Sequence, residues 1–180
     1  MKELSISKAF TLLEPGPVTL ITTSDAGKYN MMALSWHIVL DFTGRFAVMT
    51  GPWNYSYKAL MKNKECVVNI PGADLLEKTI GAGTTTGSET DKFTKFNLTP
   101  LEAGVVSCPL IKECIASIEC RVIDHIKAYD LIILDTVKAW IVPDYKERHA
   151  FHYRGDGNFI LEGKVLNYRK EMAPRLAPGV

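Results

Sequence analysis

Short apolar runs recur along the chain and are separated by turn residues, a pattern that predicts a mainly β protein. The expected strands are Val18–Thr23, Asn30–Leu40, Arg45–Thr50, Glu65–Ile70, Ile115–His125, Leu131–Val142 and Phe159–Tyr168. Strands that follow one another with few helices favour an antiparallel, Greek-key-like β-barrel. Because long strand–helix alternation is missing, the pattern argues against a doubly wound parallel sheet.

Two short helices and one long loop interrupt this series. Asn54 is expected to cap a helix over residues 55–63, since its side chain can accept a hydrogen bond from a free backbone amide, and Asp74 is expected to cap a helix ending at Ile80. Residues 81–100 are rich in Gly and Thr and predict a long loop, a kind of segment that often carries function. We expect one domain over residues 1–180 with a peripheral tail at 170–180.

The stretch Asn-Met-Met-Ala-Leu-Ser-Trp at residues 30–36 fits neither face of an ordinary strand. Alternation places Met31, Ala33, Ser35 and His37 on one face and Asn30, Met32, Leu34 and Trp36 on the other. Neither face is cleanly apolar. The stretch is therefore either a half-buried core strand with a few polar residues or a wall against which a flat ligand lies. His37 itself is either a structural histidine or a group facing such a ligand.

Charge and composition exclude some classes of function. The chain of 180 residues has 21 basic and 20 acidic residues, so it lacks the basic excess expected of a general nucleic-acid binder. No apolar run approaches the roughly 20 residues that cross a bilayer, and the first residues lack the apolar block of a signal peptide. We therefore expect a cytoplasmic protein that binds neither nucleic acid nor membrane.

The cysteines point to buried thiols rather than to a metal site. Cys66, Cys108, Cys114 and Cys120 lack the close pairs typical of zinc sites, and the histidines add no ligand spacing, so no metal is expected. Cys114 and Cys120 are six residues apart in an expected strand and would share a face. About 20 Å of extended chain would separate them, too far for a disulfide.

Two segments have residues suited to binding an anion. Asn54, Ser56 and Lys58 lie at the start of the expected helix, where free amides and the helix dipole attract negative charge. The segment Thr-Thr-Thr-Gly-Ser-Glu-Thr-Asp-Lys-Phe adds hydroxyl groups and Lys92. Neither segment is specific alone, because a hydroxyl-rich loop with one lysine is usually just solvated.

The order of these motifs resembles the flavin reductase-like family, the FMN-binding split barrels, and most closely its flavoredoxin branch. The matching segments are PVTLITTSDAGKYNMMALSW, TGPWNYSYKALMKNKECVVNIP, GAGTTTGSETDKF with NLTP, IKECIASIEC and HYRGDGNFILEGKVL. The resemblance extends from Pro17 to Leu166. It implies a split barrel that binds FMN non-covalently, in a homodimer with the flavin at the seam between the subunits.

The resemblance also implies a set of cofactor contacts. Strand 30–36 would run beside the flavin ring, with Asn30, Ser35 and Trp36 as contacts and Ala33 and Leu34 contributing backbone groups. The ribityl and phosphate contacts would be Asn54, Ser56 and Tyr57, with Lys92 as the cation beside the phosphate. Phe159 would pack near the ring or the partner subunit. No catalytic residue is implied, because the flavin supplies the redox chemistry.

The chain departs from the family at one position. Many members have Gly-Asp-His just before the strand that is written here LIILDTV, whereas this chain has Tyr129 and Asp130 and no histidine. Three functions remain open: an FMN-dependent oxidoreductase of the NAD(P)H:flavin reductase type, a non-enzymatic FMN carrier that passes electrons between redox proteins, and a flavin-free binding module. The missing histidine slightly favours the carrier.

Overall fold

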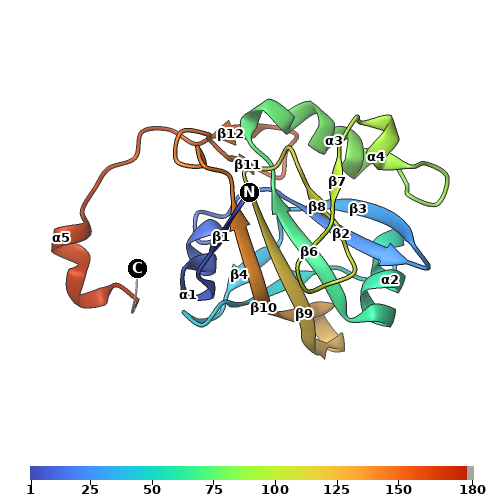
Figure 1. Ribbon diagram of the computed structural model, residues 1–180, viewed down its shortest axis with the longest axis horizontal. Coiled ribbons are helices and arrows are strands. Elements are labelled where there is room, and N and C mark those ends of the chain that lie inside the picture. The colour runs from blue at the N-terminus through green and yellow to red at the C-terminus, as the bar shows by residue number, and fades with distance from the viewer. Residues whose placement is uncertain (178–180) are drawn as a thin grey trace.

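The computed structural model describes residues 1–177 as a curved antiparallel sheet, a half-barrel with short helices around it (Figure 1). The strand order is β3-β2-β6-β9-β10-β5-β4, with β1 also paired to β10. The strands of this sheet are β1 (Lys2–Leu4), β2 (Thr19–Asp25), β3 (Lys28–Leu34), β4 (His37–Val39), β5 (Arg45–Met49), β6 (Glu65–Ile70), β9 (Ala116–Ile126) and β10 (Leu131–Ile141). The expectation of a mainly β, antiparallel barrel-like fold is confirmed.

The strand expected over Asn30–Leu40 is two strands that lie at opposite ends of the sheet order. The chain breaks at Ser35 and Trp36, between β3 and β4. β3 pairs with β2, and β4 pairs with β5. The prediction of one continuous strand is therefore wrong. The apolar pattern continues through Ser35 and Trp36, but the segments before and after these residues pair with different strands.

The helices lie close to where the sequence predicts them, but the side chains expected to cap them do not do so. α2 (Tyr55–Asn63) has the expected extent, but the Asn54 side chain donates to Thr50 Oγ1 instead of accepting from a helix amide. The segment at Asp74 is η2 (Ala73–Leu75) followed by α3 (Leu76–Thr84), and the Asp74 carboxylate pairs with Arg148. The expected long loop contains the end of α3, then α4 (Lys92–Lys95) and the start of β7 (Pro100–Leu101), which pairs with β8 (Leu110–Ile111).

Both faces of β3 are packed, which explains its mixed composition. Met32 and Leu34 belong to the cluster inside the curved sheet. Met31 belongs to a second cluster that includes residues of α3 and α4, with Ala33 packed against it. The expected alternation of Met31 and Met32 is confirmed, and α3 with α4 forms a layer over the outer face of β3.

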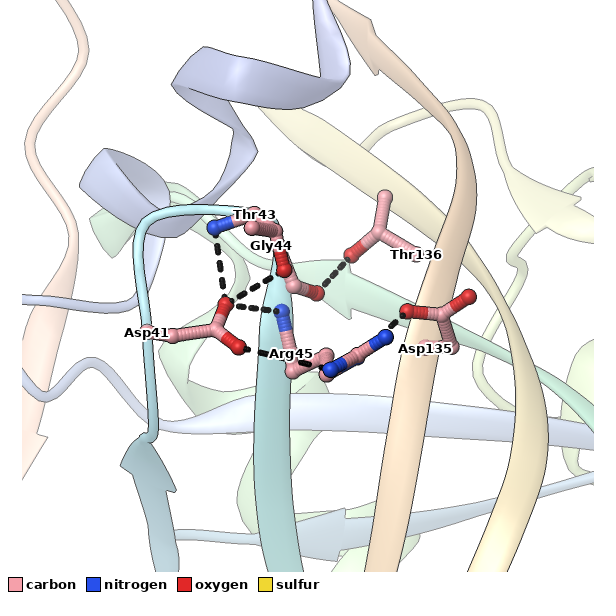
Figure 2. Close-up of polar contacts among 6 residues, drawn as sticks. All are labelled: Asp41, Thr43, Gly44, Arg45, Asp135 and Thr136. Atoms are coloured by element: carbon pink, nitrogen blue, oxygen red, sulfur yellow. Dashed lines mark hydrogen bonds and ion pairs between the residues drawn. The ribbon is translucent and has the colours of Figure 1, made fainter. Parts of the chain in front are cut away.

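The turn between β4 and β5 is held by polar contacts to β10 (Figure 2). Asp41 Oδ1 accepts from the Thr43 amide at 2.7 Å and from the Arg45 amide at 3.3 Å. Arg45 Nε lies 3.4 Å from Asp135 Oδ1, and Thr136 Oγ1 donates to Gly44 O at 2.6 Å. This turn is therefore a fixed part of the sheet.

The C-terminal part departs most from the expectation. Of the strand expected at Phe159–Tyr168, only β12 (Phe159–Leu161) forms, and it pairs with β11 (Phe151–Tyr153). The chain then leaves the body, forms α5 (Arg169–Met172) and η4 (Ala173–Arg175), and lies apart from the sheet, as Figure 1 shows. The tail was expected to be peripheral, and its last residues, 178–180, lie outside the described part.

The four cysteines are free and buried, as expected. Cys66 and Cys120 face each other across β6 and β9 inside the sheet. Cys114 precedes β9 and belongs to the cluster beneath α3 and α4. The expectation that Cys114 and Cys120 share a face is wrong, because Cys114 is not part of the strand.

Three further short helical segments lie among the described residues. α1 (Ile6–Ala9) continues into η1 (Phe10–Leu12), and η3 (Lys127–Tyr129) joins β9 to β10. The Phe10 ring lies 5.3 Å from the Phe42 ring, so η1 packs against the β4–β5 turn.

Candidate functional site

A pocket of about 210 Å³ lies where β3, the start of α2, the end of α3 and α4 meet. Its walls come from four segments that are far apart in the sequence. Five of the residues that the sequence singles out line it: Asn30, Ala33, Asn54, Ser56 and Lys92. The pocket adjoins a wider groove, with which it shares Asn30, Tyr55, Ser56 and Gly87.

Asn30 and Ser56 form the polar centre of this pocket. Asn30 Nδ2 donates to Ser56 Oγ at 2.8 Å, and both side chains are buried. Asn30 Oδ1 is left to accept a further hydrogen bond, and the Ser56 hydroxyl hydrogen to donate one. Gly87 lies so close to Asn30 that a Cβ there would collide with the amide group. The loop after α3 is thus shaped around Asn30.

Lys92 is a buried cation at the edge of the pocket. Only 5% of it is exposed, and Nζ donates to Met31 O at 2.8 Å and to Ala82 O at 2.7 Å. Among the described residues no carboxylate pairs with it. Burial lowers its pKa to about 8, so the amine remains mainly protonated at neutral pH. An ammonium group has three donors, and two are used to join β3 to α3.

The first turn of α2 adds backbone donors. Asn54 is the N-cap residue, and the Asn54 side chain points its amide at Thr50, as its 3.1 Å bond to Oγ1 shows. The amides of Tyr55 and Ser56 come before the first intrahelical hydrogen bonds and have no partner inside the helix. These amides, the N-terminal end of the helix dipole and Lys92 give the pocket the character of an anion site.

The other predicted contacts lie outside the lining of this pocket. Leu34 is buried inside the sheet, and Ser35 and Trp36 lie beyond the end of β3. Tyr57 packs inside the sheet near His125, because one step along a helix turns a side chain by about 100° from Ser56. Phe159 contacts Phe151 and Tyr153. For these residues the cofactor roles stay predictions.

Two parts of the pocket, Trp53 and Gly83, were not singled out from the sequence. Trp53 forms one wall with its ring packed over Gly51, and Gly83 allows α3 to approach Ala33 closely. Residues 84–87, the start of the hydroxyl-rich segment, also line the pocket. The spacing of Gly51, Gly83 and Gly87 next to polar residues was the available signal, since glycine marks places where chains approach closely.

His37 is part of the structure rather than of the pocket. Its Nε2 lies 2.8 Å from Pro17 O, and desolvation lowers the pKa of the imidazole. Over the described residues, no group of His, Cys, Asp and Glu side chains could hold a metal ion. Within the same residues no helix is long and apolar enough to cross a membrane.

Comparison with known proteins gives one family. The model of the flavin reductase-like domain matches residues 12–161. An uncharacterized protein of Archaeoglobus fulgidus is 34% identical over 62% of this chain and 64% of its own length. The uncharacterized protein YddH of Escherichia coli is 27% identical over 89% of this chain and 94% of its own. The match thus spans just under two thirds of the first of these relatives.

Solved structures show the same fold at lower identity. An FMN-binding domain of a flavin reductase-like enzyme from Shewanella baltica superposes with a TM-score of 0.85, at 22% identity, over 92% of this chain and 96% of that one. Flavoredoxin of Desulfovibrio vulgaris superposes with a TM-score of 0.78, at 21% identity, over 84% of this chain and 89% of that one. A putative flavin reductase of Shewanella frigidimarina with a split-barrel domain superposes with a TM-score of 0.72. It is 16% identical to this chain, and the match covers 88% of this chain and 89% of that one.

Proposed function

Because this chain belongs to the flavin reductase-like domain family, we propose that it binds FMN non-covalently and passes electrons through it. The observation that carries the proposal is the anion site, where buried Lys92 and the free amides of α2 meet beside Asn30 and Ser56. A phosphate ester is the part of FMN that such a site suits, because its oxygens are strong acceptors for charged and backbone donors.

The residues present fit the cofactor at this end. Lys92 and the amides of Tyr55 and Ser56 would hold the phosphate, and Asn30 Oδ1 and the Ser56 hydroxyl would bond the hydroxyls of the ribityl chain. The pocket of about 210 Å³ is smaller than most ligand sites, which take roughly 300–1,000 Å³. The rest of the cofactor would therefore extend beyond it, along Ala33 and the Trp53 wall or into the adjoining groove.

The chain's own residues prepare this site for the cofactor. Burial keeps water away from Lys92, and its bonds to Met31 O and Ala82 O fix the position of Nζ before a ligand arrives. The bond from Asn54 to Thr50 fixes the first turn of α2. When bound, FMN supplies the redox chemistry, by accepting a hydride or passing single electrons.

Two forms of the function remain to be separated. In an NAD(P)H-dependent oxidoreductase the nicotinamide would reduce the flavin directly. In an electron carrier the donor and acceptor would be redox proteins. The carrier is favoured here because the segment before β10 lacks the family's histidine. In that segment Tyr129 is exposed and Asp130 has a left-handed backbone conformation.

A titration with FMN tests the proposal. Wild-type protein stripped of flavin should quench FMN fluorescence on binding, and Lys92→Met should weaken binding by about 10- to 100-fold, since a hydrogen bond to a charged group contributes about 1.5–3 kcal/mol. Lys95→Met is the matched control, because Lys95 lies exposed on the same helix. Ser56→Ala removes one oxygen and should also weaken binding, and because it leaves Asn30 Nδ2 without its acceptor, its unfolding is measured alongside.

Equal FMN affinity in all four proteins, or no binding by the wild type, would contradict the proposal. If FMN binds, anaerobic addition of NADH or NADPH separates the two forms. Bleaching of the flavin within seconds indicates the oxidoreductase. A flavin that ignores both nicotinamides but is reduced by dithionite indicates the carrier.

A further inference from the structure

Trp53 has an exposed indole whose position is nevertheless fixed. The residue lines the candidate pocket and is 62% exposed. A Cβ at Gly51 would collide with the six-membered ring of the indole, so this ring rests against the main chain of Gly51. The bond from Asn54 Nδ2 to Thr50 Oγ1 fastens the chain on either side of Trp53. A rigid, exposed aromatic side chain in the lining of a pocket is typical of a site that an aromatic ligand completes.

Apolar residues line the pocket together with Trp53. Met32 and Ala33 come from β3, and Gly83 comes from α3. A Cβ at Gly83 would lie 3.0 Å from the Cβ of Ala33, so the two elements approach closely here and leave a wall without large side chains. A flat and largely apolar ring suits such a wall, because ligand pockets are lined mainly by apolar and aromatic groups. These residues can therefore receive the flavin ring, whereas the anion site receives the phosphate.

The groove beside the pocket is less suited to the ring. Its lining contains five charged residues: Asp25, Lys28, Lys58, Glu89 and Asp91. An apolar ring laid over these groups would take several charges out of water, which is costly. In the lining of the pocket the charged side chain is Lys92, which belongs to the anion site. The flavin ring should thus extend from the anion site toward Trp53 rather than into the groove.

We infer that the indole of Trp53 stacks on the flavin ring, and that Gly51 is the positioning residue that sets the indole for this contact. The inference rests on the proposed FMN function and adds to it the side chain that recognises the ring. It also distinguishes between two tryptophans. The resemblance points to Trp36, but that residue lies beyond the end of β3 and is not part of the pocket lining. Stacked aromatic rings attract each other beyond the effect of their burial, so the contact at Trp53 should contribute to affinity.

The chemistry of the two rings gives Trp53 a role that packing alone would not. Indole is electron-rich and the oxidised flavin ring is electron-poor, so stacking favours the oxidised form. The reduced ring is itself electron-rich and gains less from the contact. Because Trp53 would hold the oxidised flavin more tightly than the reduced one, it should lower the reduction potential of the bound flavin. An indole in contact with a flavin also quenches its fluorescence by donating an electron to the excited ring, which a phenyl group does not do.

Fluorescence titration of FMN into wild-type protein and tryptophan variants tests the inference. Trp53→Ala should bind FMN roughly 10- to 100-fold more weakly, the usual effect of removing an aromatic stacking partner. Trp53→Phe retains an aromatic ring and should keep most of the affinity, but its bound FMN should become fluorescent and have a higher reduction potential. Trp36→Phe makes the same change at the competing tryptophan, and FMN bound to that variant should stay as dark as in the wild type.

A variant at Gly51 and a ligand without a ring separate stacking from general damage to the pocket. The backbone of Gly51 is outside the left-handed region, so Gly51→Ala can be accommodated by the main chain while its Cβ displaces the indole. This variant keeps all its tryptophans and should nevertheless lose both FMN affinity and quenching. Ribose 5-phosphate carries a phosphate and hydroxyls but no flavin ring. Measured by calorimetry, its affinity should be the same in the wild type, Trp53→Ala and Gly51→Ala.

Several outcomes would overturn the inference while leaving the proposed FMN function intact. These are bound FMN that stays dark in Trp53→Phe, fluorescence released by Trp36→Phe instead, and equal FMN affinity in Trp53→Ala and the wild type. A parallel loss of ribose 5-phosphate binding in Trp53→Ala would also overturn it, because Trp53 would then hold the pocket together rather than recognise the ring. A wild-type protein that binds no FMN would overturn both the function and the inference.

Discussion

Replacing Glu119 by Gln should cost much of the stability of this protein, although Glu119 lies outside the candidate site. The side chain is fully buried on β9, and no basic side chain of the described residues forms an ion pair with it. Its carboxylate accepts four hydrogen bonds: from Gly104 N at 2.8 Å, Val105 N at 2.7 Å, Val106 N at 3.1 Å and Trp140 Nε1 at 2.7 Å. The carboxylate thus ties residues 104–106, in the loop before β8, to the sheet, and Glu65 holds the next residue, Ser107.

The magnitude follows from the bonds that Gln cannot make. Its amide has one oxygen, so the NH2 group would face either the donors at Oε1 or those at Oε2. Two N–H groups that are buried or part-buried would then lose their acceptor. Each buried donor without a partner costs about 1–3 kcal/mol. We expect the free energy of unfolding to fall by about 3–5 kcal/mol, out of about 5–15 kcal/mol for a typical domain.

Urea unfolding, followed by tryptophan fluorescence, measures this change. The control is Glu113→Gln, where one exposed carboxylate accepts a single bond from Thr99 N. Hydrogen exchange should show faster exchange at the amides of residues 104–106 in Glu119→Gln. A loss below 1 kcal/mol, or unchanged exchange in that segment, would refute the reasoning. Because Glu119 does not line the pocket that contains Lys92 and Ser56, FMN affinity of the folded variant should stay the same.

Two further predictions concern titratable groups. Burial lowers the pKa of the His37 imidazole below its ordinary value of about 6.5, so the unfolded chain takes up that proton more readily. The contribution of neutral His37 to the free energy of unfolding should thus be fully present above pH 6.5 and be lost as the pH falls. His37→Gln should therefore lose less stability than the wild type between pH 7.5 and 5.5. An equally steep loss in the variant would contradict this. Burial also raises the pKa of Cys108 to about 12 and raises the pKa values of Cys114 and Cys120. Ellman's reagent should label almost no thiol in native protein and four in denaturant, and rapid native labelling would contradict the burial.

The sequence predicts local features of this fold well and its long-range pairings poorly. The extent of α2 is predicted correctly, although Asn54 does not make the side-chain cap on which the prediction was based. The β2–β3 hairpin follows from turn residues between alternating segments. The break at Ser35 and Trp36 is invisible in the pattern. It exists because β3 and β4 pair with different strands, and those partners come from distant parts of the chain.

The candidate site shows the same division. Asn30 lies in a predicted strand, Ser56 in a predicted helix and Lys92 in a segment predicted as a loop. The fold brings the three side chains to one pocket. The burial of Lys92 could not be predicted, because its partners are the main-chain carbonyls of Met31 and Ala82, which carry no sequence signal. Tyr57 fits the motif equally well, but its position on the helix directs it inside the sheet.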